Sequence, residues 1–453
     1  MSFWRINKVT DRTIAALSTP NGVGGIAVIR VSGADAIPFC DKIFKGKKSL
    51  QEAESHTVHY GHIVSEGKVL DEVLVTVMRA PRTYTMEDVV EISTHGGVVA
   101  SKLVLEALMK TGVYPAEAGE FTKRAFLNGR IDLSRAEGVI DIINSKTEIE
   151  ERNALSMSGG GLSREIESMR SSLVNLAARM QVAIDYPDED LEDVTLDEIG
   201  QIISENVSKT DKLLKTANHG RILKNGIKTA IVGKPNVGKS SLLNCMSKSD
   251  RAIVTDIAGT TRDVIEEFVN FEGVPLVLLD TAGIHETEDT VERIGVERSK
   301  KAIEEAELVI LMLDLSREIE AEDKELLSLT EDKKRIVVAN KSDIKVASFE
   351  NAVEISVKTG EGIDKLSEEI RNLYSLGELE SGAPIVTNLR HLSALARVKE
   401  TLEGAKNAVI GGLPQDLAAL DIYSAIDILG EITGDTVSES IVSEIFHNFC
   451  VGK

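Results

Sequence analysis

The sequence predicts a multidomain protein in which an α/β domain is inserted into an α-helical bundle domain, behind an α+β N-terminal domain. The chain length and three sequence patterns predict this arrangement. The chain has 453 residues, which is more than one hydrophobic core usually organises. Its start carries short β-rich runs, its middle alternates strand and helix patterns, and apolar residues at helical spacing lie on both sides of that middle part. The predicted domain boundaries are residues 1–127, 128–220, 221–379 and 380–453.

The N-terminal domain is expected to combine a sheet with a few helices. Turn-forming residues such as Pro20-Asn21-Gly22 separate its apolar runs. A helix is expected over residues 98–110. The predicted strands are Ile26–Val31, Thr57–Val64, Val69–Met78 and Asp88–Ser93.

The helical domain is predicted from apolar stripes. Apolar residues recur at 3-4-3 spacing from Leu133 to Ile143, and a longer stripe runs from Ile166 to Ala183. Such stripes mark long helices that pack against one another. In the tail, Thr436 and Glu439 resemble a capping box at the start of a further amphipathic helix.

The charge and cysteine content restrict the class of protein. The net charge is −21, and a strongly acidic chain does not coat nucleic acid by bulk electrostatics. No apolar run approaches the ~20 residues needed to span a bilayer, and the first residues lack the apolar core of a secretory signal. Cys40, Cys245 and Cys450 lie too far apart for a zinc site or a disulfide framework. We therefore expect a cytoplasmic protein.

A phosphate-binding loop is predicted at Gly233–Ser240, with the sequence GKPNVGKS. It follows an apolar strand over residues 228–232 and opens a helix, which is the context that this motif requires. Its glycines let backbone N–H groups surround phosphate oxygens, and the helix N-terminus adds partial positive charge. Lys239 is expected to reach the β- and γ-phosphates, and Ser240 to bind Mg²⁺.

Two further motifs complete the phosphate side. Asp280-Thr281-Ala282-Gly283 ends the predicted strand Leu276–Leu279, so that Asp280 can hold Mg²⁺ through water. Gly259-Thr260-Thr261 lies between this motif and the phosphate loop, where a mobile switch is needed. Thr261 is the natural second Mg²⁺ ligand.

The base is predicted to be guanine. Asn340-Lys341-Ser342-Asp343 follows the predicted strand Ile336–Ala339. A carboxylate at Asp343 accepts hydrogen bonds from guanine N1–H and the 2-amino group. Adenine would leave it unpaired, at a cost of ~1–3 kcal/mol. Ser356-Val357-Lys358 fits the loop behind the base. Four motifs in register therefore predict a P-loop, Ras-like G domain that hydrolyses GTP.

The catalytic group is left open by these motifs. Ras-like proteins place a glutamine after the Asp-x-x-Gly segment to orient the attacking water, but this chain has Ile284 there. Asn236 could hold a monovalent cation beside the phosphates, or could only stabilise the loop. Glu292 could orient water, although a solvent-facing helix glutamate is the simpler interpretation.

Several longer segments resemble one family, the MnmE or TrmE tRNA modification GTPases, over essentially the whole chain. The segments in the N-terminal and helical parts are TIAALSTPNGVGGIAVIRVSG, YTMEDVVEISTHGG, GEFTKRAFLNGRIDLSRAE and the tail CVGK. Those in the G domain are GKPNVGKSSLLN, TDIAGTTRD, DTAGIHETEDTVERIG and NKSD. A G domain inserted between helices, together with a cysteine four residues from the end, is specific to this family.

The resemblance implies a hydrolysis mechanism that depends on K⁺. The G domains would dimerise across their switch faces, with K⁺ bound by Asn236, Thr255, Ile257 and Thr260, and Glu292 would orient the water. Motifs and resemblance together predict a GTP-binding set of Asn236, Val237, Gly238, Lys239, Ser240, Ser241, Thr255, Asp256, Ile257, Ala258, Gly259, Thr260, Thr261, Asp280, Thr281, Ala282, Gly283, Asn340, Lys341, Ser342, Asp343, Ser356, Val357 and Lys358.

The resemblance also implies a folate site in the N-terminal domain, which would form the homodimer. A 5-formyl-tetrahydrofolate-type carrier would contact Arg30, Glu91, Arg130 and Lys453. The residues alone leave this open, because Arg30 can equally be structural and Glu91 simply alternates outward along its strand. The role of Cys450 also has two interpretations: it could act near the folate, or it could pack as a small apolar residue.

The function implied is tRNA modification. With the flavoprotein MnmG, the protein would add an aminomethyl or carboxymethylaminomethyl group to C5 of the wobble uridine, U34, using the folate's one-carbon unit. One alternative is a regulatory or ribosome-assembly GTPase whose outer domains only bind partners. Another is a folate-dependent transferase with a regulatory nucleotide domain.

Overall fold

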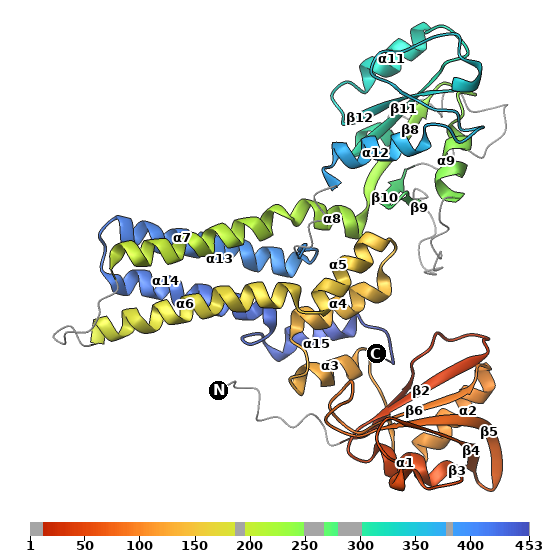
Figure 1. Cartoon of the computed structure of the whole chain (residues 1–453), viewed down its shortest axis with the longest axis vertical. Coiled ribbons are helices and arrows are strands. Elements are labelled where there is room, and N and C mark those ends of the chain that lie inside the picture. The colour runs from red at the N-terminus through yellow and green to blue at the C-terminus, as the bar shows by residue number, and fades with distance from the viewer. Residues whose placement is uncertain (1–11, 186–194, 249–266, 280–300, 377–383, 453) are drawn as a thin grey trace. The chain divides into compact units, whose positions relative to one another are not determined.

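The computed structural model describes residues 12–185, 195–248, 267–279, 301–376 and 384–452. Figure 1 draws the whole chain, which separates into two compact units. The first comprises Met1–Ile140, Met157–Ser204 and Glu400–Lys453, and the second Asp141–Ser156 and Glu205–Lys399. Among the described helices, none combines the length and apolar character needed to cross a membrane.

The first unit contains a seven-stranded sheet in the order β3-β4-β5-β6-β2-β1-β7. Its strands pair antiparallel, except that β1 and β7 are parallel. Helices α1 and α2 share a core with alternate apolar residues of the sheet, such as Val31, Val75 and Ile92. The predicted strands and the predicted helix are confirmed. The bounds are β1 Ile14–Leu17, β2 Ile26–Ser32, α1 Ala36–Ile43, β3 Phe44–Gly46, β4 Thr57–Ser65, β5 Lys68–Met78, β6 Val89–His95, α2 Val98–Met109 and β7 Tyr114–Pro115.

Helices form the rest of the first unit. The long stripe predicted from Ile166 lies on α6, which packs against α14. Phe126 of α3 and Phe446 of α15 share an apolar cluster with the start of α4. The bounds are α3 Glu120–Leu127, α4 Leu133–Asn144, α6 Gly161–Asp185, α14 Gln415–Thr433 and α15 Glu439–His447, with α4 continuing into the second unit.

The capping box predicted in the tail is wrong. Helix α15 has Ser438 at its N-cap, so that Glu439 is already its first residue. The hydroxyl of Thr436 instead donates to the carbonyl of Asp427 at 2.8 Å, at the end of α14. The preceding helix therefore competes successfully for the hydroxyl that the sequence pattern assigned to the next one.

The second unit contains a six-stranded sheet in the order β13-β12-β11-β8-β10-β9. All neighbours are parallel except β9 and β10. Apolar clusters cover both faces, one including Leu242 of α9 and Leu366 of α12, the other including Leu326 of α11. This confirms the predicted mostly parallel sheet. The bounds are β8 Ile227–Gly233, α9 Lys239–Lys248, β9 Glu267–Phe271, β10 Val274–Leu278, β11 Leu308–Asp314, α11 Ala321–Leu329, β12 Arg335–Asn340, β13 Val353–Glu354 and α12 Ile363–Leu373.

The chain returns from this sheet beside the segment by which it entered. Asn153 exchanges two hydrogen bonds with the backbone of Ile385, both at 3.1 Å. The hydroxyl of Thr216 accepts the N–H of Val386 at 3.0 Å. Entry and exit are thus tied together, as an inserted domain requires. The remaining helices are α5 Glu148–Ser158, α7 Leu196–Lys215, α8 Ala217–Asn225 and α13 Leu389–Ile410; α5, α7 and α13 run across the division between the units.

Candidate nucleotide and folate sites

Strand order brings the phosphate loop and the base motif together. The loop follows β8, the base motif follows β12, and β11 lies between these two strands. The three strands are parallel, so their carboxyl ends lie at one edge of the sheet, where ligands of such folds bind.

The phosphate loop has a backbone that demands particular residues. Asn236 adopts a φ of 63° and Gly238 a φ of 105°. A Cβ at Gly238 would lie 2.3 Å from Nδ2 of Asn340. The glycine is therefore required both by its backbone angle and by the close approach of the base motif.

Asn340 joins the two halves of the site. Its Nδ2 donates to the carbonyl of Val237 at 2.8 Å, and its Oδ1 accepts the N–H of Val357 at 3.1 Å. Asn340 is buried. One side chain therefore holds the phosphate loop and the loop behind the base in fixed relation.

Lys239 lies inside the phosphate loop. Its Nζ donates to the carbonyls of Gly233 and Lys234 at 2.7 and 2.8 Å. Burial lowers the pKa of its ammonium below the ordinary value of 10.5, because the charged form loses hydration. A phosphate placed beside Nζ would reverse that loss, which is the role predicted for this lysine.

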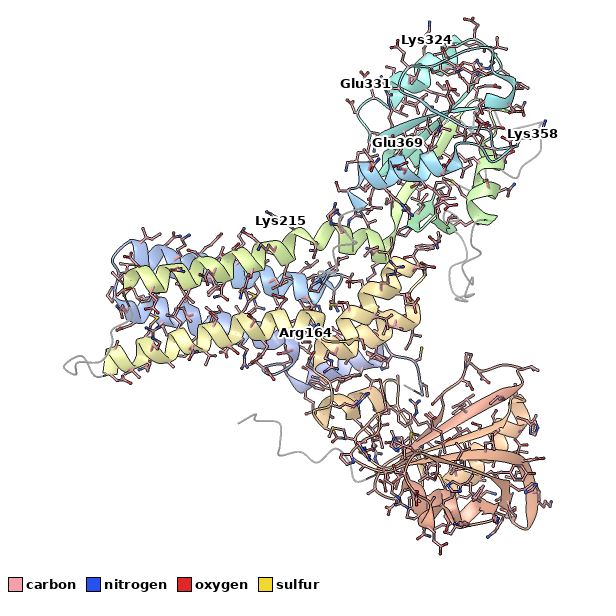
Figure 2. The ribbon with its side chains drawn as sticks, in the orientation of Figure 1. Arg164, Lys215, Lys324, Glu331, Lys358 and Glu369 are labelled. Atoms are coloured by element: carbon pink, nitrogen blue, oxygen red, sulfur yellow. The ribbon has the colours of Figure 1, made fainter. Side chains whose placement is uncertain are left out.

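The side chains predicted to recognise the base are held by their neighbours. The Ser356 hydroxyl donates to Oδ1 of Asp343 at 2.8 Å, which orients the carboxylate and leaves Oδ2 for a ligand. Lys341 donates to Oδ2 of Asp314, at the end of β11, at 2.6 Å. Lys358 projects from the loop that follows β13 (Figure 2).

These residues surround a cavity of about 880 Å³, within the size range of small-ligand sites. Asn244, Cys245 and Ile344 also line it, and none of the three was predicted. The signal was available for two of them, because Asn244 and Cys245 lie one helical turn beyond Ser240 and Ser241 on α9. The full lining comprises Asn236, Gly238, Ser241, Asn244, Cys245, Asn340, Lys341, Asp343, Ile344, Ser356, Val357 and Lys358.

The switch side of the predicted site lies outside the described residues. The roles assigned to Mg²⁺, K⁺ and water at these positions therefore stay predictions. The positions concerned are Thr255, Asp256, Ile257, Ala258, Gly259, Thr260, Thr261, Asp280, Thr281, Ala282, Gly283, Ile284 and Glu292, together with Lys453 of the tail.

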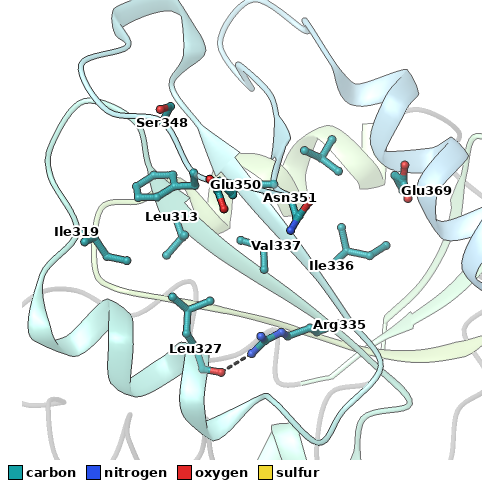
Figure 3. Close-up of a pocket in the computed structure, with 13 residues that line it drawn as sticks. Leu313, Ile319, Leu327, Arg335, Ile336, Val337, Ser348, Glu350, Asn351 and Glu369 are labelled. Carbon is teal, nitrogen blue, oxygen red and sulfur yellow. Dashed lines mark hydrogen bonds between the residues drawn. The ribbon is translucent and has the colours of Figure 1, made fainter.

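A second hollow, of about 800 Å³, lies between α11, β12 and the segment before β13 (Figure 3). Aliphatic side chains such as Leu313 and Val337 form much of its wall. The guanidinium of Arg335 donates to the carbonyl of Leu327. The hollow contains no predicted site residue, and we assign it no ligand.

In the N-terminal domain, three predicted folate contacts converge. Nη2 of Arg30 lies 2.8 Å from Oε1 of Glu91, on the neighbouring strand. The guanidinium carbons of Arg30 and Arg130 lie 5.5 and 4.8 Å from the ring centroid of Tyr84. Arg130 also donates to the Tyr84 carbonyl at 3.2 Å. Two of the three charged residues therefore lie against one aromatic ring, and the third, Glu91, pairs with Arg30.

Tyr84 was not singled out from the sequence. Its hydroxyl lies 2.9 Å from that of the buried Thr122. The loop that carries Tyr84 is fixed by Glu87, which pairs with the buried Arg124 at 3.0 Å. Two arginines, one carboxylate and one aromatic face are a donor set suited to a planar, anionic ligand.

Cys450 is exposed. Its carbonyl accepts the N–H of Gly119 at 3.3 Å. The apolar cluster that contains Phe446 and Phe449 does not include it, so packing does not explain this cysteine.

The chain is similar to known proteins over almost its whole length. The family model described as the MnmE helical domain matches residues 133–450, and that described as the GTP-binding protein TrmE N-terminus matches residues 13–130. A protein of Lactobacillus acidophilus named tRNA modification GTPase MnmE is 48% identical over 453 residues, which cover 97% of this chain and 98% of that relative. A protein of Listeria innocua with the same name is 48% identical over 456 residues, covering 97% and 99%. Among solved structures, Era in complex with MgGDPNP and a 16S ribosomal RNA fragment aligns at 29% identity over 38% of this chain and 65% of that chain, with a TM-score of 0.25.

Proposed function

The chain belongs to the MnmE family of tRNA modification GTPases, and on this premise we propose that it uses GTP hydrolysis to drive modification of the wobble uridine of tRNA in the cytoplasm. The observation that carries the proposal is the joined site around Asn340, in which one side chain holds both the phosphate loop and the base loop. Matches to both family models support it.

Guanine would be selected by Asp343. The Ser356 hydroxyl donates to Oδ1 of this carboxylate, and the carboxylate's remaining acceptor sites would accept hydrogen bonds from N1–H and the 2-amino group. Lys341, held by Asp314, would lie against the base. An adenine base would leave the carboxylate without donors, which is costly away from water.

Phosphate binding would use the backbone of the phosphate loop and Lys239. The loop N–H groups and the start of α9 provide oriented positive dipoles. Ser240 and Thr261 would hold Mg²⁺, which neutralises charge on the β- and γ-phosphates. A bound phosphate would place an anion beside the buried ammonium of Lys239, and this would raise the pKa of Lys239 toward its ordinary value.

Hydrolysis would depend on K⁺ and on Glu292. Asn236, Thr255, Ile257 and Thr260 would supply oxygen ligands for K⁺ when two G domains dimerise. Glu292 would orient the attacking water in place of the missing glutamine. The exposed Asn236, at its positive φ, lines the described part of the cavity, which supports its share of this role.

The N-terminal domain would bind a 5-formyl-tetrahydrofolate-type carrier, whose one-carbon unit supplies the new carbon at C5. Arg30, Glu91 and Arg130 would bind it, with Lys453 from the tail. The pair of guanidiniums beside Tyr84 supports an anionic, ring-containing ligand. A homodimer and the flavoprotein MnmG would complete the assembly. A flavoprotein partner would also explain how a chain of net charge −21 acts on tRNA.

Nucleoside mass spectrometry tests the proposal. Transfer RNA from cells lacking this protein should lose 5-aminomethyl-type wobble uridines, and complementation should restore them. When the Glu292→Ala variant is expressed in these cells instead, the modified uridines should stay absent if GTP hydrolysis drives the modification. An unchanged nucleoside profile would reject the tRNA role and favour an assembly GTPase.

The potassium requirement has a separate test. Replacing KCl by NaCl at equal ionic strength should slow GTP hydrolysis by the full-length protein. Equal rates in the two salts would remove K⁺ from the mechanism and leave the tRNA role intact.

A further inference from the structure

A cluster of charges joins the phosphate loop to helix α11. Nζ of Lys234, the second residue of the loop, lies 2.5 Å from Oε2 of Glu320 and 2.8 Å from Oε2 of Glu322. The Lys234 side chain is only 16% exposed, whereas the two glutamates are 55% and 68% exposed. The hydrogen bonds from Glu320 and then Glu322 raise the pKa of Lys234, as expected for an ammonium held between two carboxylates.

The start of α11 is itself fixed. Arg317 pairs with Asp323 through both Nη atoms, at 2.6 and 3.0 Å. Oδ2 of Asp323 also accepts the N–H of Glu320 at 3.0 Å. Asp323 is buried. The glutamates that hold Lys234 therefore belong to a well-ordered helix start rather than to a free surface loop.

The same segment reaches the base motif at its other end. Asp314 accepts the ammonium of Lys341 at 2.6 Å and the hydroxyl of Ser316 at 2.6 Å. Asp314 is also buried. The segment from Asp314 to Asp323, here called the brace, is thus bonded to the phosphate loop through Lys234 and to the base motif through Lys341.

We propose that Lys234 is a positioning residue for nucleotide binding, because its pairing with Glu320 and Glu322 holds the phosphate loop in its binding geometry against the brace. The inference rests on GTP hydrolysis alone and is independent of the proposed folate and potassium chemistry.

The physical reason is pre-organisation. The loop must present several N–H groups in one direction, with Asn236 and Gly238 at positive φ. A loop that samples other conformations loses affinity in proportion to the time it spends in them. The Lys234 carbonyl also accepts Nζ of Lys239, so a shift of Lys234 displaces the lysine predicted to bind phosphate.

A purely electrostatic role makes the opposite prediction. If Lys234 only added positive charge near the phosphates, then Glu320 and Glu322 would weaken that attraction. Neutralising the two glutamates would release the charge of Lys234 and tighten nucleotide binding. If pairing positions the loop, the same change weakens binding.

The experiment compares Glu322→Gln and the double variant E320Q/E322Q with the wild-type full-length chain. Binding of a fluorescent GDP analogue is titrated at fixed Mg²⁺ and K⁺. We expect Kd to rise about threefold in the single variant and about tenfold in the double variant, because each change weakens one of the two pairs that hold Lys234. The kcat at saturating GTP should change less than twofold.

Matched controls lie on the same helix. Glu325→Gln removes the same charge from an exposed residue of α11, and Kd should not change. Lys324, on α11 in Figure 2, gives K324M as the control for K234M. We expect K234M to weaken binding about tenfold and the conservative K234R to retain most of the affinity.

Two results would overturn the proposal. Tighter binding by E320Q/E322Q would mean that Lys234 acts through its charge alone. A lower Tm with unchanged Kd in that variant would mean that the pairs stabilise the fold without positioning the loop.

Discussion

The two candidate sites of this chain differ in the groups that form them: backbone in one and side chains in the other. The nucleotide site is largely backbone, and its side chains mostly hold other parts of the backbone in place, as Asn340 does for Val237 and Val357. The site in the N-terminal domain consists of side chains from separate stretches, with Arg30, Glu91 and Arg130 around Tyr84.

This difference determines how each site fails and how each can be found. A backbone site fails when an added atom displaces the chain, so its glycines and turn residues form a contiguous motif. A side-chain site fails when a contacting group is removed, and its members lie far apart in the sequence.

Gly238→Ala should weaken guanine nucleotide binding about 100-fold or more. The new Cβ would collide with Asn340 Nδ2, at 2.3 Å, and alanine is strained at this positive φ. Titration of a fluorescent nucleotide measures the loss. Gly200→Ala is the control, because nothing lies within 4 Å of a Cβ at this helical position. Binding within tenfold of wild type by the Gly238 variant would refute a backbone-built site.

Asp343→Asn should weaken GTP binding roughly 10- to 100-fold, since a hydrogen bond to a charged group contributes ~1.5–3 kcal/mol. An amide at this position can donate to a 2-oxo group, so xanthosine triphosphate should lose less affinity or gain some. Competition between the two nucleotides measures the change. Asp364→Asn, at an exposed position of α12, should alter neither. Equal losses for both nucleotides would argue against base recognition by Asp343.

Tyr84→Leu should weaken binding of 5-formyl-tetrahydrofolate about tenfold, because the ring contacts both guanidiniums and each contact contributes ~0.5–2 kcal/mol. Tyr84→Phe keeps the ring and should lose about threefold or less. Isothermal titration measures both, with Tyr60→Leu on β4 as a control at an exposed tyrosine. Absence of binding by the wild type would reject the folate site itself. Equal binding by wild type and Tyr84→Leu would reject only the role of the ring.

Nucleotide affinity should change little near pH 7 and should fall at alkaline pH. The pKa of Lys239 is lowered by burial in the free protein, and a bound phosphate would raise it. Binding then takes up a proton between the two pKa values, so affinity declines as pH rises through the lower one, by at most tenfold per pH unit. Nucleotide titrations from pH 7 to pH 10 measure the slope. In Lys239→Arg the part of this slope that comes from Lys239 should vanish, since arginine stays protonated.

The prediction from sequence succeeded where the signal is contiguous. The strands β8, β11 and β12 were visible as apolar runs, and the residues after β8 and β12 carry nucleotide motifs. Tyr84 could not be found in this way, because its importance depends on Arg30 and Arg130, which only the folded domain brings beside it. The capping box at Thr436 failed for a related reason: the hydroxyl has a competing acceptor, Asp427, on the preceding helix.

The prediction also missed two residues of helix α9 that line the cavity of the nucleotide site. Asn244 and Cys245 line it, although they lie outside the phosphate-loop motif. Helical periodicity relates them to Ser240 and Ser241, but deciding that this face meets the cavity requires the position of β12. Sequence patterns thus identify the residues predicted to bind phosphate, and the fold adds further residues that line the cavity beside them.

The hydrogen bond between the Val357 amide and Asn340 makes the hydrogen–deuterium exchange of this one amide a reporter of the site. The proton on that nitrogen is held by Oδ1 of the side chain whose Nδ2 holds the phosphate loop. When the phosphate loop moves away from Asn340 and the Asn340 side chain rotates, the Val357 amide proton becomes open to exchange with solvent. Its exchange rate in heavy water therefore counts the openings of the whole site, without nucleotide, label or turnover.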